Sequence, residues 1–240
     1  MKTKGILITI FSLILISVSG CGKEKKDLDY YNNYLNKLDA TKIESIEKGK
    51  YELLEISKDE EITIDYINAF ESFLLNCGIN LNFNPEITNE QLTSNGFIIE
   101  LEEEGRILRF DYNYLYNNFK DVAPKVKVDQ YLLRKTIYEY AGANDLYTNT
   151  ELLVTWDKYK EILILIDDYV RKYPDEIDIK NDYEQWFDVY IGVATLENNS
   201  IYDSNNKLIP EVKAGYEDIL NNHKDFLRYM DLQTHYNEHK

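Results

Sequence analysis

Two histidines near the end of the chain have the spacing of a metal site. His235 and His239 are four residues apart, with Glu238 between them. On a helix, this spacing places both imidazoles on one face, where they could hold a divalent cation. The remaining histidine, His223, falls within an apolar helical pattern. We expect His235 and His239 to belong to a solvated C-terminal end rather than to a metal site, and His223 to be a hydrogen-bonded histidine in or beside the core.

The other candidate metal ligands are acidic. The segment 203–207, DSNNK, has acidic and amide side chains like those of calcium-binding loops. It lacks the glycine of the sharp turn and the glutamate at the twelfth place, and Lys207 stands where a ligand is needed. The sequence therefore predicts a surface loop. Neighbouring acids such as Asp167 and Asp168, and the run 102–104, are expected to be solvated charges.

The chain contains no recognisable catalytic motif. It has no G-x-S-x-G, H-E-x-x-H, C-x-x-C, P-loop or G-x-G-x-x-G pattern. Cys77 follows Phe70, Phe73 and Leu74 at helical spacing, just before Gly78. We therefore expect a helix that ends near Gly78 and a buried, unreactive thiol on its apolar face.

The first 26 residues carry the most specific signal in the chain. Two lysines precede an apolar run over residues 6–18, which is too short for a comfortable membrane span. The run ends in Val18-Ser19-Gly20-Cys21, which resembles the lipobox of bacterial lipoproteins. The resemblance implies cleavage of a signal peptide over residues 1–20. It also implies diacylglycerol on the Cys21 thiol and a protein held on the outer face of the cell membrane, with no other cofactor.

The charge of the chain excludes some partners. Forty-three acidic and 27 basic side chains give a formal net charge of −16, and loss of residues 1–20 would make it −18. Such a surface repels nucleic acid. The abundance of tyrosine, asparagine, isoleucine and lysine is typical of an AT-rich genome, and therefore of a Gram-positive host. Residues 21–27 would form a short lipidated tether that keeps the domain close to the bilayer.

The remaining residues are expected to be mainly helical, as a helical bundle or a helical-repeat-like array. We expect an α+β part over 28–125 and an all-α part over 126–240, which could also form one continuous domain. The expected helices, from apolar spacing and from glycine and proline positions, cover 27–46, 63–77, 113–121, 129–141, 151–173, 180–196 and 210–230. Residues 49–62 are expected to be a strand or loop.

One β-hairpin is expected over residues 97–112. A turn at Glu104-Gly105 would pair Leu101 with Leu108 and Glu100 with Arg109, so that apolar residues share one face. The alternative is a helix from 106 to 120.

Residues 169–175, YVRKYPD, resemble the helix-ending turn of tetratricopeptide-like lipoproteins. Tyr190-Ile191-Gly192 lies about where those repeats place a helix-packing tyrosine and glycine. The resemblance covers about 35 residues and implies only that neighbouring helices pack as hairpins.

Three functions are compatible with this pattern. The first is a non-enzymatic adaptor that presents a helix face or groove to a protein partner at the membrane surface. The second is a module that binds cell-wall glycan or peptide in a cleft between the two halves. The third, less favoured, is a hydrolase, which would require a buried carboxylate pair.

Overall fold

The computed structural model describes residues 26–102, 105–142, 145–148 and 150–240. Over these residues the chain forms ten helices and one two-stranded antiparallel sheet. In chain order the elements are α1 (Leu28–Lys37), α2 (Glu44–Ile56), α3 (Ile64–Asn82), α4 (Asn89–Ser94), β1 (Phe97–Glu102), β2 (Gly105–Phe110), α5 (Tyr112–Phe119), α6 (Lys125–Ala141), α7 (Trp156–Lys172), α8 (Ile177–Tyr190), α9 (Pro210–Asn222) and α10 (Tyr229–His239). The expected mainly helical class, with a small hairpin in the N-terminal half, is confirmed.

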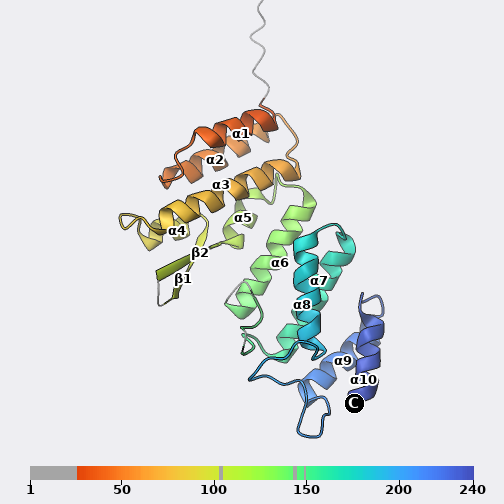
Figure 1. Ribbon diagram of the computed structural model, residues 1–240. Coiled ribbons are helices and arrows are strands. Elements are labelled where there is room, and N and C mark those ends of the chain that lie inside the picture. Colours follow the sequence, from red (N-terminus) through yellow and green to blue (C-terminus); the bar gives the residue numbers. More distant parts are fainter. Residues whose placement is uncertain (1–25, 103–104, 143–144, 149) are drawn as a thin grey trace, which may run out of the picture.

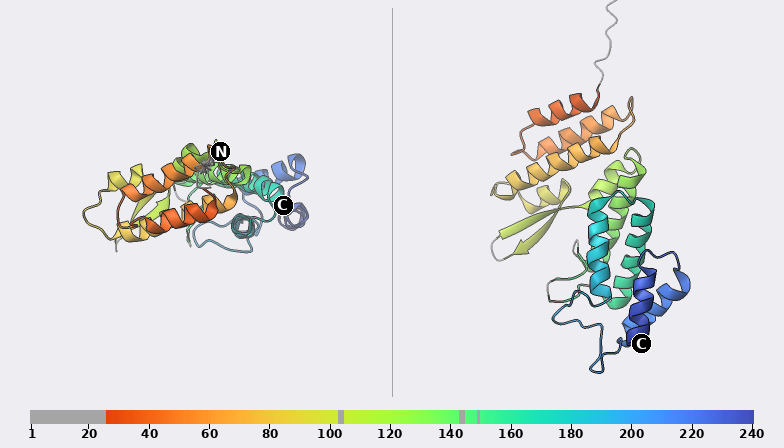
Figure 2. Two further views of the ribbon diagram at one scale, coloured as in Figure 1. Left: turned by 90° about the horizontal axis from the view of Figure 1, so that it is seen from above. Right: turned by 45° about the vertical axis from the view of Figure 1, so that its right-hand side comes forward.

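The helices follow one another along an elongated molecule, from α1 at one end to α9 and α10 at the other (Figure 1). The right-hand view of Figure 2 shows the same succession, with the hairpin projecting to one side of α3. Most helix contacts join elements that are neighbours in sequence. None of the helices in the described part of the chain is both long and apolar enough to cross a membrane.

Two hydrophobic cores hold this array together, and α6 belongs to both. Tyr131 of α6 packs into the core built from α1 to α5. Leu133 and Ile137, two and six residues later, pack into the core built from α7 to α10. The chain thus passes from one core to the other within α6 (Figure 1).

The single helix expected over 27–46 is wrong, because two helices occupy this region. The carboxylate of Asp39 accepts hydrogen bonds from the N–H (3.0 Å) and hydroxyl (2.6 Å) of Thr41, and this local turn separates α1 from α2. The strand or loop expected over 49–62 is also wrong, because α2 extends to Ile56. Gly49 is the reason that α2 fits there, since a Cβ at this position would lie 3.0 Å from Leu35.

The expected end of a helix at Gly78 is wrong as well, because α3 continues to Asn82. Gly78 serves packing instead: a Cβ there would lie 2.8 Å from the ring of Phe97 on β1. The real end of α3 is stabilised by Arg106 on β2. Its guanidinium donates to the carbonyls of Leu81 and Asn82, both at 3.0 Å, which belong to the last turn of the helix. The Leu81 carbonyl also accepts from the backbone N–H of Asn84 at 3.1 Å.

The hairpin exists, and α5 follows it, so the alternative helix over 106–120 is wrong. The register differs from the expected one by two residues. Ile99 pairs with Leu108, and Glu102 pairs with Gly105. Because side chains alternate with a period of two, this shift leaves the same residues on each face. Arg109 Nε still reaches Glu100 Oε2 at 3.2 Å, now as a diagonal neighbour.

In the second half the helix ends differ from the expected ones. The helix expected from residue 151 begins at Trp156, because the hydroxyl of Thr155 caps it. Gly142 ends α6 with φ 68°, as expected. The helix expected over 180–196 covers 177–190, with Gly192 at φ 70° just after it.

The continuous helix expected over 210–230 is wrong. α9 ends before His223, and α10 begins at Tyr229 and packs back against α9. The break is held by a buried carboxylate of α7, since Asp167 Oδ1 accepts a hydrogen bond from the backbone N–H of Leu227 at 2.9 Å.

Candidate functional site

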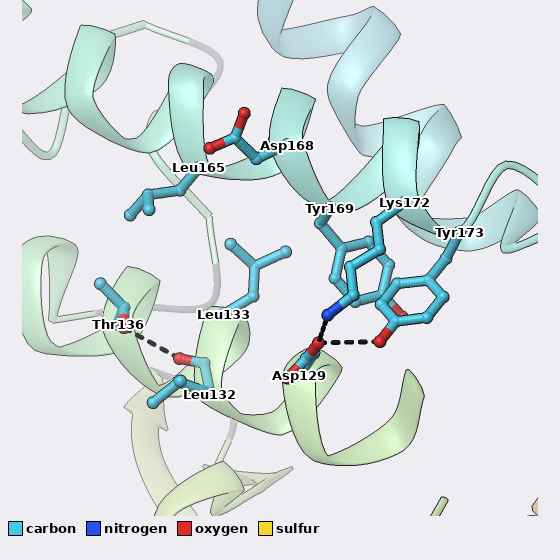
Figure 3. A pocket seen from close by; sticks show the side chains of 9 residues that line it. All are labelled: Asp129, Leu132, Leu133, Thr136, Leu165, Asp168, Tyr169, Lys172 and Tyr173. Atoms are coloured by element: carbon cyan, nitrogen blue, oxygen red, sulfur yellow. Dashed lines mark hydrogen bonds and ion pairs between the residues drawn. The ribbon is translucent and has the colours of Figure 1, made fainter. Parts of the chain in front are cut away.

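A groove lies on the surface between α6 and α7. It has a volume of about 310 Å³. Its lining residues come from both helices and are Asp129, Leu132, Leu133, Thr136, Leu165, Asp168, Tyr169, Lys172 and Tyr173. Figure 3 shows leucines of both helices lining the groove, with Asp129, Lys172 and the two tyrosines gathered at one end and Asp168 beside Leu165.

The floor of the groove is apolar and open to solvent. Leu133 and Tyr169 are buried beneath it, while Leu132 on α6 is 45 % exposed and Leu165 on α7 is 42 % exposed. Isolated exposed leucines are common on protein surfaces. Two that face each other across a groove are less common and indicate a surface that another molecule could cover.

One end of the groove is closed by a polar cluster around Asp129. Its carboxylate accepts hydrogen bonds from Lys125 Nζ (2.6 Å), Lys172 Nζ (2.6 Å) and the hydroxyl of Tyr173 (2.8 Å). Burial opposes the charge, but these three donors outweigh it and hold the pKa of Asp129 below its usual value. The carboxylate is therefore ionised and fixed, which suits a structural end wall better than proton transfer.

Asp167 and Asp168 have different environments, which corrects the expectation that both are solvated. Asp168 is exposed on the rim of the groove and pairs with Arg171. The side chain of Asp167 is only 1 % exposed and accepts from Arg171 Nε at 2.8 Å. Burial raises the pKa of Asp167 despite the hydrogen bonds from Leu227 and Arg171 that favour its charge. Its role is to link α7 to the segment between α9 and α10.

His235 is also placed differently from expectation, because it lies in an ordered helix and is half-buried rather than part of a solvated end. Its Nε2 lies 2.6 Å from the hydroxyl of Tyr202, and its Nδ1 lies 3.2 Å from the hydroxyl of Tyr216. The ring of His239 lies beside it, tilted by 35°, with ring centroids 4.6 Å apart. Both nitrogens of His235 are thus engaged by tyrosines. Within the described ranges no three His, Cys, Asp or Glu side chains group as a metal site would need.

The hydrogen bonds of Tyr216 fix the protonation of His235. The single hydroxyl proton of Tyr216 is donated to the carbonyl of Tyr190 at 2.7 Å. Tyr216 must therefore accept from Nδ1–H of His235, which leaves Nε2 free to accept from Tyr202. A neutral His235 satisfies every partner, whereas a second proton on Nε2 would compete with the hydroxyl proton of Tyr202.

The free energy of unfolding should therefore decrease as the pH falls, because His235 is neutral in the folded protein. Burial first, and then the charge of His239, lower the pKa of His235 from 6.5, so the unfolded chain binds its proton more readily than the folded protein. The stabilisation is complete above pH 6.5 and is lost as the pH falls below it. We expect urea midpoints measured from pH 7.5 to about 5 to fall less steeply for His235→Gln than for the wild type. An unchanged slope in His235→Gln would refute the assignment.

The remaining candidates have structural roles or lie outside the described residues. Cys77 is fully buried in α3, and burial raises its pKa to about 12, so it is an unreactive thiol as expected. Asp203 uses its carboxylate to accept from the backbone N–H of Asn205 (2.8 Å) and Lys207 (3.0 Å), as in a surface turn. His223 is half-buried at the C-terminal end of α9. Cys21 and the signal segment 1–20 lie outside the described residues.

A hydrolase would require a pair of buried carboxylates. Among the described residues the buried acids are Asp167 and Glu52. Glu52 accepts from Lys26 Nζ at 2.6 Å in the first core, far along the chain from Asp167 in the second. The described part of the chain thus offers no buried carboxylate pair.

No family model matches the chain, and no curated protein or solved structure is significantly similar to it. The groove was not foreseen from sequence. Leu165 lies at the edge of the apolar face of α7, and the structure leaves this edge uncovered. A stripe wider than the neighbouring helices can cover is the signal that could have located the groove.

Proposed function

We propose that this chain is a lipid-anchored, non-enzymatic binding module that holds an amphipathic helix of a partner protein in the groove between α6 and α7. The observation that carries the proposal is the pair of exposed leucines, Leu132 and Leu165, facing one another across that groove. Helices that dock in grooves use apolar anchors at successive turns. The two leucines offer contact to such anchors, and the Asp129 cluster limits the groove at one end.

The negative charge of the chain favours a partner with basic side chains. The chain carries a formal net charge of −16, and Asp168 stands on the rim of the groove with its side chain 57 % exposed. A partner helix with lysine or arginine beside its apolar face would be attracted to this surface and oriented by it. Electrostatic attraction of this kind mainly raises the association rate and weakens with salt.

The anchor would hold the module near the bilayer. Lys26 is tied to the domain through Glu52, and its carbonyl accepts from the hydroxyl of Tyr66 at 3.5 Å. If Cys21 carries the lipid, only four residues lie between it and this fixed point, so five residue-to-residue steps join them. Even fully extended they would span about 17 Å. This short reach favours a partner in the membrane or at its outer surface.

The test is photo-crosslinking from position Thr136, which lines the groove, in the native membrane, followed by identification of the crosslinked peptide. We expect one dominant protein, joined through an amphipathic helical segment with basic residues. Leu132→Ser combined with Leu165→Ser should reduce the crosslink about tenfold or more. Because both side chains are already about half exposed, the double variant should stay folded.

Val193→Ser is the matched control, since Val193 is 69 % exposed outside the groove. It should leave the crosslink unchanged. Cys21→Ala should abolish the crosslink in cells, because the unlipidated chain would not reach the membrane surface. A crosslink that survives the double leucine variant would overturn the groove as the binding surface.

A further inference from the structure

A second groove, in the other half of the molecule, has a different chemistry. It lies between α1 and α3 and has a volume of about 400 Å³. Its lining residues are Asn32, Leu35, Asn36 and Leu38 from α1 and its C-terminal end, and Ala69, Ser72, Phe73 and Asn76 from α3. None of these eight carries a charge, although 29 % of the chain is charged.

The walls of this groove present hydrogen-bonding groups that the protein itself does not use. Asn32 and Asn36 on one wall, and Ser72 on the other, are exposed, and their side chains form no hydrogen bond with any described residue. Asn76 Oδ1 accepts from Asn80 Nδ2 at 3.1 Å, which leaves the amide group of Asn76 free to donate. The two walls thus offer donors and acceptors of neutral type to whatever enters the groove.

The α3 wall continues into an apolar surface. Ser72, Asn76, Ile79 and Phe83 follow one another at helical spacing on one face of α3 and its C-terminal end. Ile79 is 59 % exposed and Phe83 is 83 % exposed, and Leu75 beside them is 54 % exposed. From residue 72 to residue 85 the sequence contains no charged side chain. Within α3, the groove wall and this apolar surface therefore form one strip without a charged side chain, and the guanidinium of Arg106 borders its C-terminal end.

We propose that this strip binds an extended, uncharged polypeptide segment through its backbone, with an apolar side chain of the segment at the Ile79–Phe83 end. A side-chain amide has the same donor and acceptor groups as a peptide unit, so it can pair with an exposed backbone. Four residues advance a helix by about 6.0 Å, and two residues advance an extended chain by about 6.6 Å. Successive amides on α1 therefore match alternate peptide units of a bound strand.

The uncharged lining selects against charged ligands. A charged side chain entering this strip would lose hydration without gaining an opposite charge among the eight lining residues. A glycan would also be neutral, but the aromatic side chain in the groove, Phe73, is only 8 % exposed and offers little ring face for stacking on a sugar. The backbone of a polypeptide is therefore the better match.

This inference goes beyond the proposed function, since it concerns a separate surface and a separate ligand. The α1–α3 groove belongs to the first core, whereas the α6–α7 groove lies against the second. The variants that test one groove leave the lining of the other intact.

The test uses a displayed library of capped, uncharged peptides of about six residues, which span roughly 20 Å when extended, the length of the strip along α3. The best binder is then measured against the wild type and against Asn32→Ala combined with Asn36→Ala. We expect the double variant to lose at least about tenfold in affinity. Methylation of alternate backbone nitrogens in the peptide should cause a similar loss, because it removes backbone donors without changing the side chains.

The matched control is Asn113→Ala combined with Asn117→Ala, another exposed pair four residues apart, on α5. It should change the affinity by less than about twofold. Three results would each overturn the inference: a library that yields no binder sensitive to the Asn32–Asn36 double variant, a binder indifferent to backbone methylation, or an oligosaccharide of N-acetylglucosamine that shifts the side-chain amide signals of Asn32 and Asn36 in NMR spectra when no peptide does.

Discussion

Glu71→Ala is expected to lower the free energy of unfolding by about 3 kcal/mol, because it leaves a buried ammonium group without its partner. Glu71 on α3 accepts hydrogen bonds from Lys127 Nζ at 2.9 Å and from the hydroxyl of Tyr131 at 2.7 Å, both on α6. The side chain of Lys127 is 10 % exposed, and Tyr131 is fully buried. This cluster joins α6, the helix shared by both cores, to the longest helix of the first core.

The measurement is urea unfolding followed by two signals. Both tryptophans, Trp156 and Trp186, lie in the second core, so their fluorescence reports on that core, whereas far-ultraviolet circular dichroism reports on all helices. In the wild type we expect the two transitions to coincide. In Glu71→Ala they should separate, because the polar contacts that join α6 to α3 are lost and the coupling between the cores is weakened.

Glu86→Ala is the control, since Glu86 is exposed and forms no ion pair with a described residue. It should change stability by less than about 0.5 kcal/mol. Glu71→Gln combined with Lys127→Met should recover most of the loss, because neither charge then remains buried. A small effect of Glu71→Ala, or no recovery in the double variant, would show that the cluster does not join the cores as described.

Gly215→Ala is expected to destabilise the protein by about 2 kcal/mol, even though alanine favours helix more than glycine by about 1 kcal/mol. Gly215 lies in the middle of α9, and a Cβ there would stand 2.3 Å from the hydroxyl oxygen of Tyr190. Tyr190 is fully buried among Trp156, Tyr159 and Tyr216, so its rigid ring has no room to move. The loss from the clash therefore exceeds the gain in helix propensity.

Tyr190→Phe provides the matched test. The hydroxyl of Tyr190 is buried and has no hydrogen-bond partner among the described residues. Removing it should leave stability unchanged or raise it by about 1 kcal/mol. In the double variant, alanine at 215 should cost less than in the wild type, because the oxygen that it meets is gone. Equal costs of Gly215→Ala in both backgrounds, measured by chemical denaturation, would exclude this contact as the cause.

The positions of most helices could be predicted from the sequence because they depend on local signals. Apolar residues at steps of three and four located the central part of α7, Gly142 ended α6, and Pro210 began α9. Alternation located the hairpin, although not its register. Helix ends were less predictable, because Asp39 and Arg106 act through hydrogen bonds that spacing does not reveal.

By itself the sequence determined the mainly helical class, the burial of Cys77 and the absence of known catalytic motifs. Only the tertiary structure decided that Gly78 packs against Phe97 rather than ending a helix, that His235 lies between two tyrosines, and that Leu165 faces solvent. The physical reason is the same in each case. Residue spacing determines which side chains share a face of a helix, whereas the neighbour that covers that face comes from a distant part of the chain.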